Sequence, residues 1–277
     1  MATSKELAPI KNSDDQLPAY LQGTKVVNDD NFDQSDIVIP RVKLLQSTSA
    51  ECEAFNDAKT GVFWHTGLDK LLGEEIKFIV ADRRKKYLLQ APIQDGQGIL
   101  ARSDDAKKWD RLGKWSVKIK GQKNPVTWEI TDLDVEKSGL TKWGTQIKDD
   151  ENSPPAATLF YDYLIFLPDH LDLGPAVLSL ARSQIKKAKK GLNDKIAMHA
   201  NNGRPMQSLI FQAGVADEVA DGQSFKNFTF RSAGFVQSEE LFNQMLEYRG
   251  SLANLKIQDE ASIDEPDRQT DDGEGSF

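Results

Sequence analysis

The chain has 277 residues, of which 39% are hydrophobic and 8% aromatic, and its formal net charge is −8. This length suits one large domain or two small ones, and the acidic charge argues at first against a nucleic-acid-binding protein. One cysteine, Cys52, excludes an internal disulfide, and the three histidines do not lie at metal-ligand spacing from it. We therefore expect no metal site and no cofactor.

Neither a membrane protein nor a secreted one is indicated. No run of about eighteen apolar residues occurs, so we expect no membrane span. The first twenty residues contain acids and no apolar central region, so they do not resemble a secretory signal. An intracellular protein is the expectation.

The charge is unevenly distributed along the chain. Residues 1–36 hold seven acidic residues and three lysines, and residues 259–277 hold eight acidic residues and one arginine. Because the whole chain has a charge of −8, the middle carries +3 and is mildly basic. Residues 1–36 and 256–277 also lack apolar periodicity. We expect a disordered N-terminal arm and a disordered acidic C-terminal tail on either side of one domain, residues 37–255.

Strand patterns fill most of this domain. Residues 74–92 are rich in β-forming residues and predict one long bent strand or a tight pair. Residues 157–168 are apolar on both faces, as in a central strand, and residues 174–181 follow after a short turn to complete a hairpin. Residues 207–215 and 223–236 predict a second pair of strands. A β-bulge is indicated in the latter, because its phenylalanines do not all share one face.

Two helices are predicted. Residues 182–203 suit an amphipathic helix, because apolar side chains recur every three or four residues. These positions are Ile185, Ala188, Leu192, Ile196 and His199. Residues 238–255 suit a second helix, which Ser238 caps. The order of strands and helices favours a mainly β fold with helices (α+β), an OB-fold-like five-stranded barrel with residues 93–155 as a large insertion. Another α+β domain with the same order is the alternative.

Motifs for catalysis are weak. The sequence has no glycine-rich phosphate loop and no G-x-S-x-G motif, and its paired acids, such as Asp104 and Asp105, lie in polar stretches. We expect a protein without catalytic activity.

Basic residues interleaved with aromatic ones form the stronger pattern. Residues 102–130 contain eight basic residues and three tryptophans, four basic residues in a row precede Tyr87, and a third basic cluster lies on the helix predicted at 182–203. Such mixtures hold single-stranded nucleic acid, because Lys and Arg contact phosphates while flat aromatic faces stack on bases. The candidate contacts are Arg83, Arg84, Lys85, Lys86, Tyr87, Lys107, Lys108, Trp109, Arg111, Trp115, Lys118, Lys120, Trp143, Arg182, Lys186, Lys187, Lys189 and Lys190.

The tryptophans are not equivalent. Trp109 and Trp143 have charged residues or glycine beside them and are predicted to be more exposed than Trp115 and Trp128, which lie in strand-like alternation. Tryptophans that pack an insertion onto a domain, and a basic helix face that is only solvated, are the alternatives. Binding of one strand further requires that the fold gathers the three basic clusters on one surface.

The last eight residues, TDDGEGSF, resemble the C-terminal tails of the single-stranded DNA-binding proteins of bacteria and bacteriophages, which are acidic and end in phenylalanine. The matching positions are Asp271, Asp272, Glu274 and Phe277; the ending EGSF departs from the DDDIPF of the bacterial proteins. An acidic tail competes with nucleic acid for a basic domain at high local concentration. The resemblance further implies that the tail recruits replication or recombination proteins, such as a polymerase, helicase, primase or nuclease.

The domain itself is similar to a group of phage-encoded proteins, in the stretches DIVIPRVKLLQ, YLLQAP, GILARS and GPAVLSLARSQIKKAKK. This similarity implies a phage source and the cytoplasm of the bacterial host, and supplies no function. We expect a non-catalytic protein that coats single-stranded DNA without sequence preference. A phage structural or assembly protein, and a recombination mediator or annealing protein, are the alternatives, and homo-oligomer formation is left open.

Overall fold

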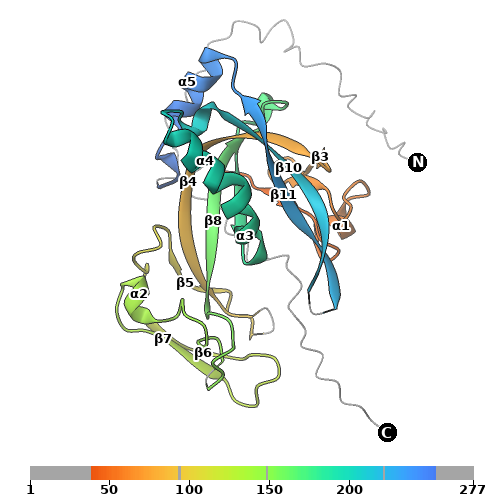
Figure 1. The fold of residues 1–277 in the computed structure, drawn as a ribbon. Helices are drawn as coiled ribbons and strands as arrows, with labels where there is room; N and C mark the ends of the chain where they lie inside the picture. Colours follow the sequence, from red (N-terminus) through yellow and green to blue (C-terminus); the bar gives the residue numbers. More distant parts are fainter. Residues whose placement is uncertain (1–38, 93–94, 148, 221, 254–277) are drawn as a thin grey trace, which may run out of the picture. The chain divides into compact units, whose positions relative to one another are not determined.

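A computed structural model describes residues 39–92, 95–147, 149–220 and 222–253 (Figure 1). The chain divides into two units, residues 1–36 and 37–277, and the described residues all belong to the second. The strands are β1 (Val42–Leu44), β2 (Phe63–His65), β3 (Lys70–Gly73), β4 (Ile76–Gln90), β5 (Ile99–Ser103), β6 (Gly113–Val117), β7 (Val126–Ile130), β8 (Ala157–Phe166), β9 (Pro175–Ala181), β10 (Leu209–Ala220) and β11 (Gln223–Phe235). The helices are α1 (Glu51–Ala54), α2 (Val135–Ser138), α3 (Ser183–Ala188), α4 (Asp194–Ala200) and α5 (Glu239–Glu247).

The main sheet is antiparallel and is built around β4, the single long strand that one interpretation of residues 74–92 predicts. Its order is β11-β10-β4-β8-β9, and β5 pairs with the far end of β4. The register of β4 against β8 shifts between Val80 and Asp82, which leaves Ala81 as the extra residue of a bulge. Because side chains alternate along a strand, the bulge changes the face to which odd-numbered residues point. Before the bulge, even-numbered residues such as Phe78 and Val80 face the largest core. After the bulge, odd-numbered residues such as Arg83 point to that same side of the sheet.

One face of the sheet is covered by a single helical segment. α3, a π-helical turn at Lys189–Asn193 and α4 follow one another without a break. Their apolar stripe is buried against Tyr161, Tyr163 and Leu178 of the sheet, which confirms the predicted amphipathic helix. The buried stripe consists of Ile185, Ala188, Leu192 and Ile196. The helix approaches β11 closely: a Cβ atom placed on Gly191 would lie 2.5 Å from Cβ of Phe230.

The opposite face is covered by α5. Its N-terminus is where the sequence predicts it, because the Ser238 side chain accepts a hydrogen bond from the Leu241 backbone N–H at 3.2 Å. The helix ends at Glu247, earlier than predicted, and a short turn at Ser251–Ala253 follows. Met245 and Leu252 are buried there in a second core with Ile79 and Leu164 of the sheet.

A smaller sheet, β1-β2-β3, packs into the largest core through side chains such as Val42 and Phe63. It is joined to the edge strand β9, where the Val177 backbone N–H donates to the Pro40 carbonyl at 2.8 Å. At the other edge strand, β11, the amide side chain of Gln46 pairs with both the N–H and the carbonyl of Lys226, each at 3.0 Å. A side chain thus occupies backbone groups that another strand would otherwise pair with.

The mainly β architecture with helices is confirmed, and so is the helix between the predicted hairpin of residues 157–181 and the predicted strand pair of residues 207–236. The OB-fold-like five-stranded barrel is not confirmed: the main sheet is open, and in the described part of the chain no strand pairing joins β9 to β11. The segment that carries the smaller sheet contacts both edge strands instead, through Pro40 at β9 and Gln46 at β11, and the strand order alone does not reveal these contacts.

The inserted segment, residues 93–155, forms its own core. The β6-β7 hairpin packs its buried face, including Val117, Val126 and Trp128, against Leu89 and Ala157 at the far end of the main sheet. α2 begins and ends as its sequence indicates, with Asp134 accepting backbone hydrogen bonds at its N-terminus and Gly139 in the left-handed conformation (φ 73°) after its last residue.

Candidate nucleic-acid interface

The basic run of β4 is divided between two faces of the sheet. Arg83, Lys85 and Tyr87 share the face on which the helical segment packs, because their β8 partners there include Tyr163 and Tyr161. Arg83 and Lys85 are exposed, and the Lys85 ammonium lies 5.5 Å from the centre of the Tyr161 ring. This face therefore presents two cations to solvent beside aromatic rings.

The other two basic residues of β4 face the opposite way, into a buried ionic cluster. Asp162, which is fully buried, accepts from Arg84 Nε at 3.2 Å, from the Lys86 ammonium at 3.3 Å and from the Ser179 hydroxyl. Arg84 also donates to the Leu252 carbonyl at 2.9 Å. Lys86 is only 1% exposed. The prediction that Arg84 and Lys86 contact nucleic acid is corrected: both side chains neutralise a buried carboxylate.

The helical segment meets the β4 cations through Asn193. Its side-chain oxygen accepts from Arg83 Nη1 and from the Tyr163 hydroxyl, both at 3.0 Å. Asn193 is the last residue of the π-helical turn, and π-turns are often found at functional sites. Burial raises the pKa of Tyr163, so this hydroxyl keeps its proton and remains a donor.

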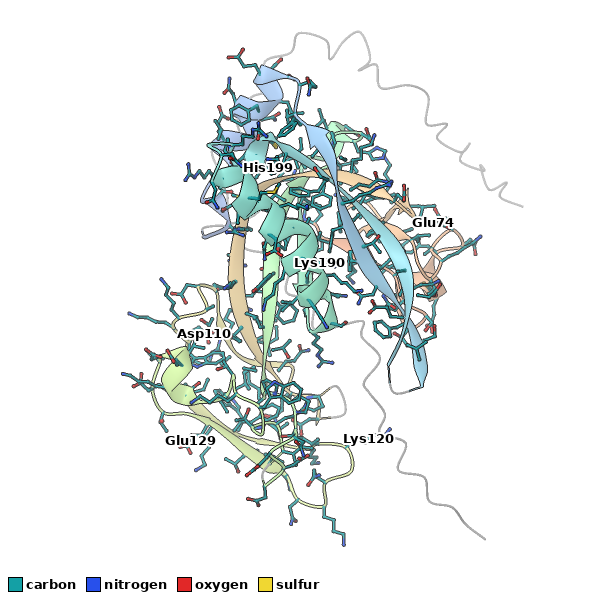
Figure 2. All side chains as sticks on the ribbon, in the orientation of Figure 1. Glu74, Asp110, Lys120, Glu129, Lys190 and His199 are labelled. Carbon is teal, nitrogen blue, oxygen red and sulfur yellow. The ribbon has the colours of Figure 1, made fainter. Side chains whose placement is uncertain are left out.

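The exposed lysines of the helical segment lie close to this junction. Lys190 is three residues before Asn193 and is exposed, as are Lys186 and Lys189; Figure 2 labels Lys190 on this segment. Lys187 differs, because it pairs with Glu218 of β10. That hydrogen bond, with a second from Asn227, lowers the pKa of Glu218. The structure thus brings two of the three predicted basic clusters together on one face.

The insertion reaches the same face through Tyr87. The Tyr87 ring lies 6.5 Å from the ring of Trp109, and Tyr87 packs against the core of the insertion. Along β4 the face therefore changes from cations at Arg83 and Lys85 to an aromatic contact with the insertion.

The exposure predicted for the tryptophans is confirmed for Trp143 and wrong for Trp109. Trp143 is 67% exposed, whereas Trp109 is 3% exposed and belongs to the core of the insertion. Its flanking lysines and aspartate misled the prediction, because they point outward while the ring points inward. Trp128 is buried as expected, and Trp115 is half-buried, with its ring folded over Gly113.

The β6-β7 hairpin has a strongly basic outer surface. From Arg111 to Trp128 the sequence has five basic residues and no acid. Two of these cations are paired, Arg111 with Asp110 at 2.7 Å and Lys114 with Glu129 at 3.4 Å. The others are exposed and have no ion pair within the described residues; they are Lys118, Lys120 and Lys123. Lys107 and Lys108 are also exposed, in the turn before Trp109.

The comparisons with known proteins identify a phage family. The family model described as Pam3 phage gp34-like protein matches residues 11–258. The chain belongs to this family. A search of curated proteins and a search of solved structures give no match.

In this member of the Pam3 phage gp34-like family, one predicted contact also has a place in the fold. Arg182 is exposed but lies at the N-terminus of α3 with a positive φ of 48°, so it also shapes the turn from β9 into the helix. The tail residues lie outside the described residues; they are Asp271, Asp272, Glu274 and Phe277.

Sequence reasoning missed three groups that hold the exposed cations of this face from below: Tyr161 lies under Lys85, and Asn193 accepts from both Arg83 and the buried Tyr163. The two tyrosines alternate with Asp162 in a strand that was expected to be apolar on both faces. Asn193 carries no signal in the sequence, because a π-turn is not visible in a helical period.

The described residues contain no group of three or more His, Cys, Asp or Glu side chains that could hold a metal ion. Within the same residues no helix is long and apolar enough to cross a membrane.

Proposed function

We propose that this phage protein binds single-stranded DNA without sequence preference, during replication or recombination of the phage genome. The observation that supports the proposal most directly is the hydrogen bond from Arg83 of β4 to Asn193 of the helical segment, three residues after the exposed Lys190. One continuous surface requires that the fold gathers the three basic clusters of the sequence, and this hydrogen bond joins the elements that carry two of them.

The chemistry of this surface suits the backbone of a single strand. Arg83, Lys85 and Lys190 offer cations to phosphates, and a protein that neutralises phosphates releases counterions. In the insertion, the exposed ring of Trp143 is available to stack on a base of any identity, which would make binding tolerant of sequence. The side chains on this face offer hydrogen-bond donors and aromatic rings. They do not form the fixed pattern of donors and acceptors that would match the edge of one particular base, so we expect no base to be preferred.

The revised contact set keeps most of the predicted residues. It omits Arg84, Lys86 and Trp109, which are occupied in the interior, and Lys187, which is half-buried in its ion pair with Glu218. Arg111 is also paired, with Asp110, but its side chain stays exposed and it is kept. The revised set consists of Arg83, Lys85, Tyr87, Lys107, Lys108, Arg111, Trp115, Lys118, Lys120, Trp143, Arg182, Lys186, Lys189 and Lys190.

The acidic C-terminal segment is proposed to compete with DNA for this surface and to recruit replication or recombination proteins of the host cytoplasm. The support is its charge, eight acids against one arginine in residues 259–277. Deleting residues 265–277 is expected to strengthen DNA binding at low salt, and unchanged or weaker binding would contradict the competition.

The binding surface is tested with one double variant that removes two of its charges. Arg83→Gln with Lys85→Gln should reduce the slope of log affinity against log salt by about 1.4, because each lost phosphate contact on a single strand contributes about 0.7. The matched control is Lys59→Gln, an exposed lysine before β2 that lies outside the proposed surface. An unchanged slope in the double variant would reject the proposed surface.

Two other functions are separable by experiment. An annealing protein would also bind single strands but would accelerate the pairing of complementary ones. A structural or assembly protein would associate with phage particles and would not respond to DNA.

A further inference from the structure

A second aromatic site lies at the far end of the helical segment. Phe235, the last residue of β11, is 39% exposed although it ends a strand of the main sheet. The guanidinium carbon of Arg204 lies 5.4 Å from the centre of its ring. The ring of His199, labelled in Figure 2, meets it edge-on at 5.5 Å and 88°. An exposed ring is thus held between a cation and a histidine.

Local sequence features build this cluster. α4 ends in a turn in which Gly203 has a positive φ of 71° and the Arg204 backbone N–H donates to the His199 carbonyl at 3.0 Å. This turn brings the arginine back beside the histidine. On β11, the register shift near Ile210 leaves Ala233 as an extra residue before Phe235. The strand end is therefore re-aimed by a bulge, as bulges do beside functional sites.

The cluster lies on the same face of the sheet as the proposed DNA surface. Phe235 is directly opposite Leu209, and Leu209 belongs to the core that the helical stripe covers. The helical segment connects the two places: it carries Lys186 and Lys190 in its first half and His199 near its end. Its eighteen residues, Ser183–Ala200, extend about 27 Å at 1.5 Å per residue.

We propose that Phe235 stacks on a base of the same single strand that crosses the β4 cations, and that Arg204 binds a neighbouring phosphate. This inference rests on the proposed function and extends it, since it assigns the strand a path along the helical segment and a second base-stacking position. The ligand class is a nucleobase with its phosphate. An exposed phenylalanine whose ring already binds a guanidinium offers a π-face for stacking and a cation for the backbone.

The experiment measures the affinity of the full chain for an oligo-dT of about 15 nucleotides, within the range that single-strand binding domains cover. Phe235→Ala should weaken binding by about 5- to 150-fold, the loss of one stacked base. Phe235→Tyr keeps the π-face and should bind like the native chain. Arg204→Gln should lower the salt slope by about 0.7, whereas Phe235→Ala should leave the slope unchanged.

An abasic strand of the same length shows whether a loss of affinity in Phe235→Ala comes from lost base stacking or from a disturbed fold. If Phe235 acts on a base, the native chain and Phe235→Ala bind the abasic strand equally. Equal losses on both strands would mean that the ring only supports the fold, and would overturn the inference. The control is Leu171→Ala, an apolar side chain that is 47% exposed and outside the proposed surface, which should bind both strands like the native chain.

The two proposals fail in different ways. If the native chain does not bind oligo-dT, the proposed function fails. If the native chain binds and Lys85→Gln weakens binding while Phe235→Ala does not, the DNA surface stands and the second stacking position is rejected.

Discussion

Two neighbouring lysines of β4 should behave in opposite ways when each is replaced by methionine, which keeps the aliphatic length and removes the charge. Lys85 faces solvent on the proposed DNA surface, and Lys86 faces Asp162 in the interior. Lys85→Met should therefore weaken DNA binding and leave the fold stable. Lys86→Met should destabilise the fold and leave the DNA contacts in place.

The magnitudes follow from burial. Removing one member of a buried ion pair costs about 3–5 kcal/mol, because the remaining charge is left without compensation. Asp162 keeps Arg84 at 3.2 Å and the Ser179 hydroxyl, so we expect about 2–4 kcal/mol for Lys86→Met. Lys85→Met loses only an exposed charge over the Tyr161 ring, worth about 0.5–1 kcal/mol.

Urea unfolding gives the free energy of each variant, and a salt series of oligo-dT titrations gives the number of phosphate contacts. Lys85→Met should lower the salt slope by about 0.7, and Lys86→Met should not change it. The reasoning is refuted if the two variants lose equal stability, or if folded Lys86→Met shows the reduced slope.

Three further predictions follow from the described packing. Trp143→Ala should weaken oligo-dT binding by about 1–3 kcal/mol and change the free energy of unfolding little, because this ring is exposed. Trp109→Ala should lower the free energy of unfolding by about 3–5 kcal/mol, because this ring is buried. The reverse pattern in DNA titration and urea unfolding would contradict the burial of the two rings. Gly191→Ala should destabilise by about 1–3 kcal/mol, because its new methyl group would lie 2.5 Å from Cβ of Phe230, and an unchanged melting temperature would argue against this close contact. Burial, with Lys70 nearby, lowers the pKa of His65 in the folded protein. The stability that depends on neutral His65 is therefore complete above about pH 6.5, the pKa of the unfolded chain. It falls as the pH drops from there toward the pKa of the folded protein, by at most about 1.4 kcal/mol per pH unit. His65→Leu should flatten this part of the stability profile, and a persisting slope would assign it to other groups.

The periodic elements were predictable from the sequence because their apolar patterns match the faces they bury. The helical stripe from Ile185 to Ile196 and the N-cap at Ser238 are local features, and the structure contains both. The long strand β4 was also visible as a run of β-forming residues.

The facing of individual side chains was not predictable, because it depends on contacts far apart in the chain. The bulge at Ala81 decides that Lys85 faces outward and Lys86 inward, and Asp162 supplies the buried charge that holds Lys86. Trp109 is buried for a similar reason: the core that covers it comes from strands elsewhere in the insertion. The contact of Gln46 with the edge strand β11 is likewise invisible in the strand pattern, because its partner Lys226 lies 180 residues away.

Single-strand binding itself is tested by titrating the intrinsic tryptophan fluorescence with oligo-dT, with duplex DNA in parallel and at two salt concentrations. We expect the single strand to quench the fluorescence, mainly through exposed Trp143 and half-buried Trp115, and the quenching to weaken as salt rises; the response to the duplex should be much smaller. No response to either nucleic acid, or equal responses that do not depend on salt, would contradict single-strand binding and favour a structural role in the phage.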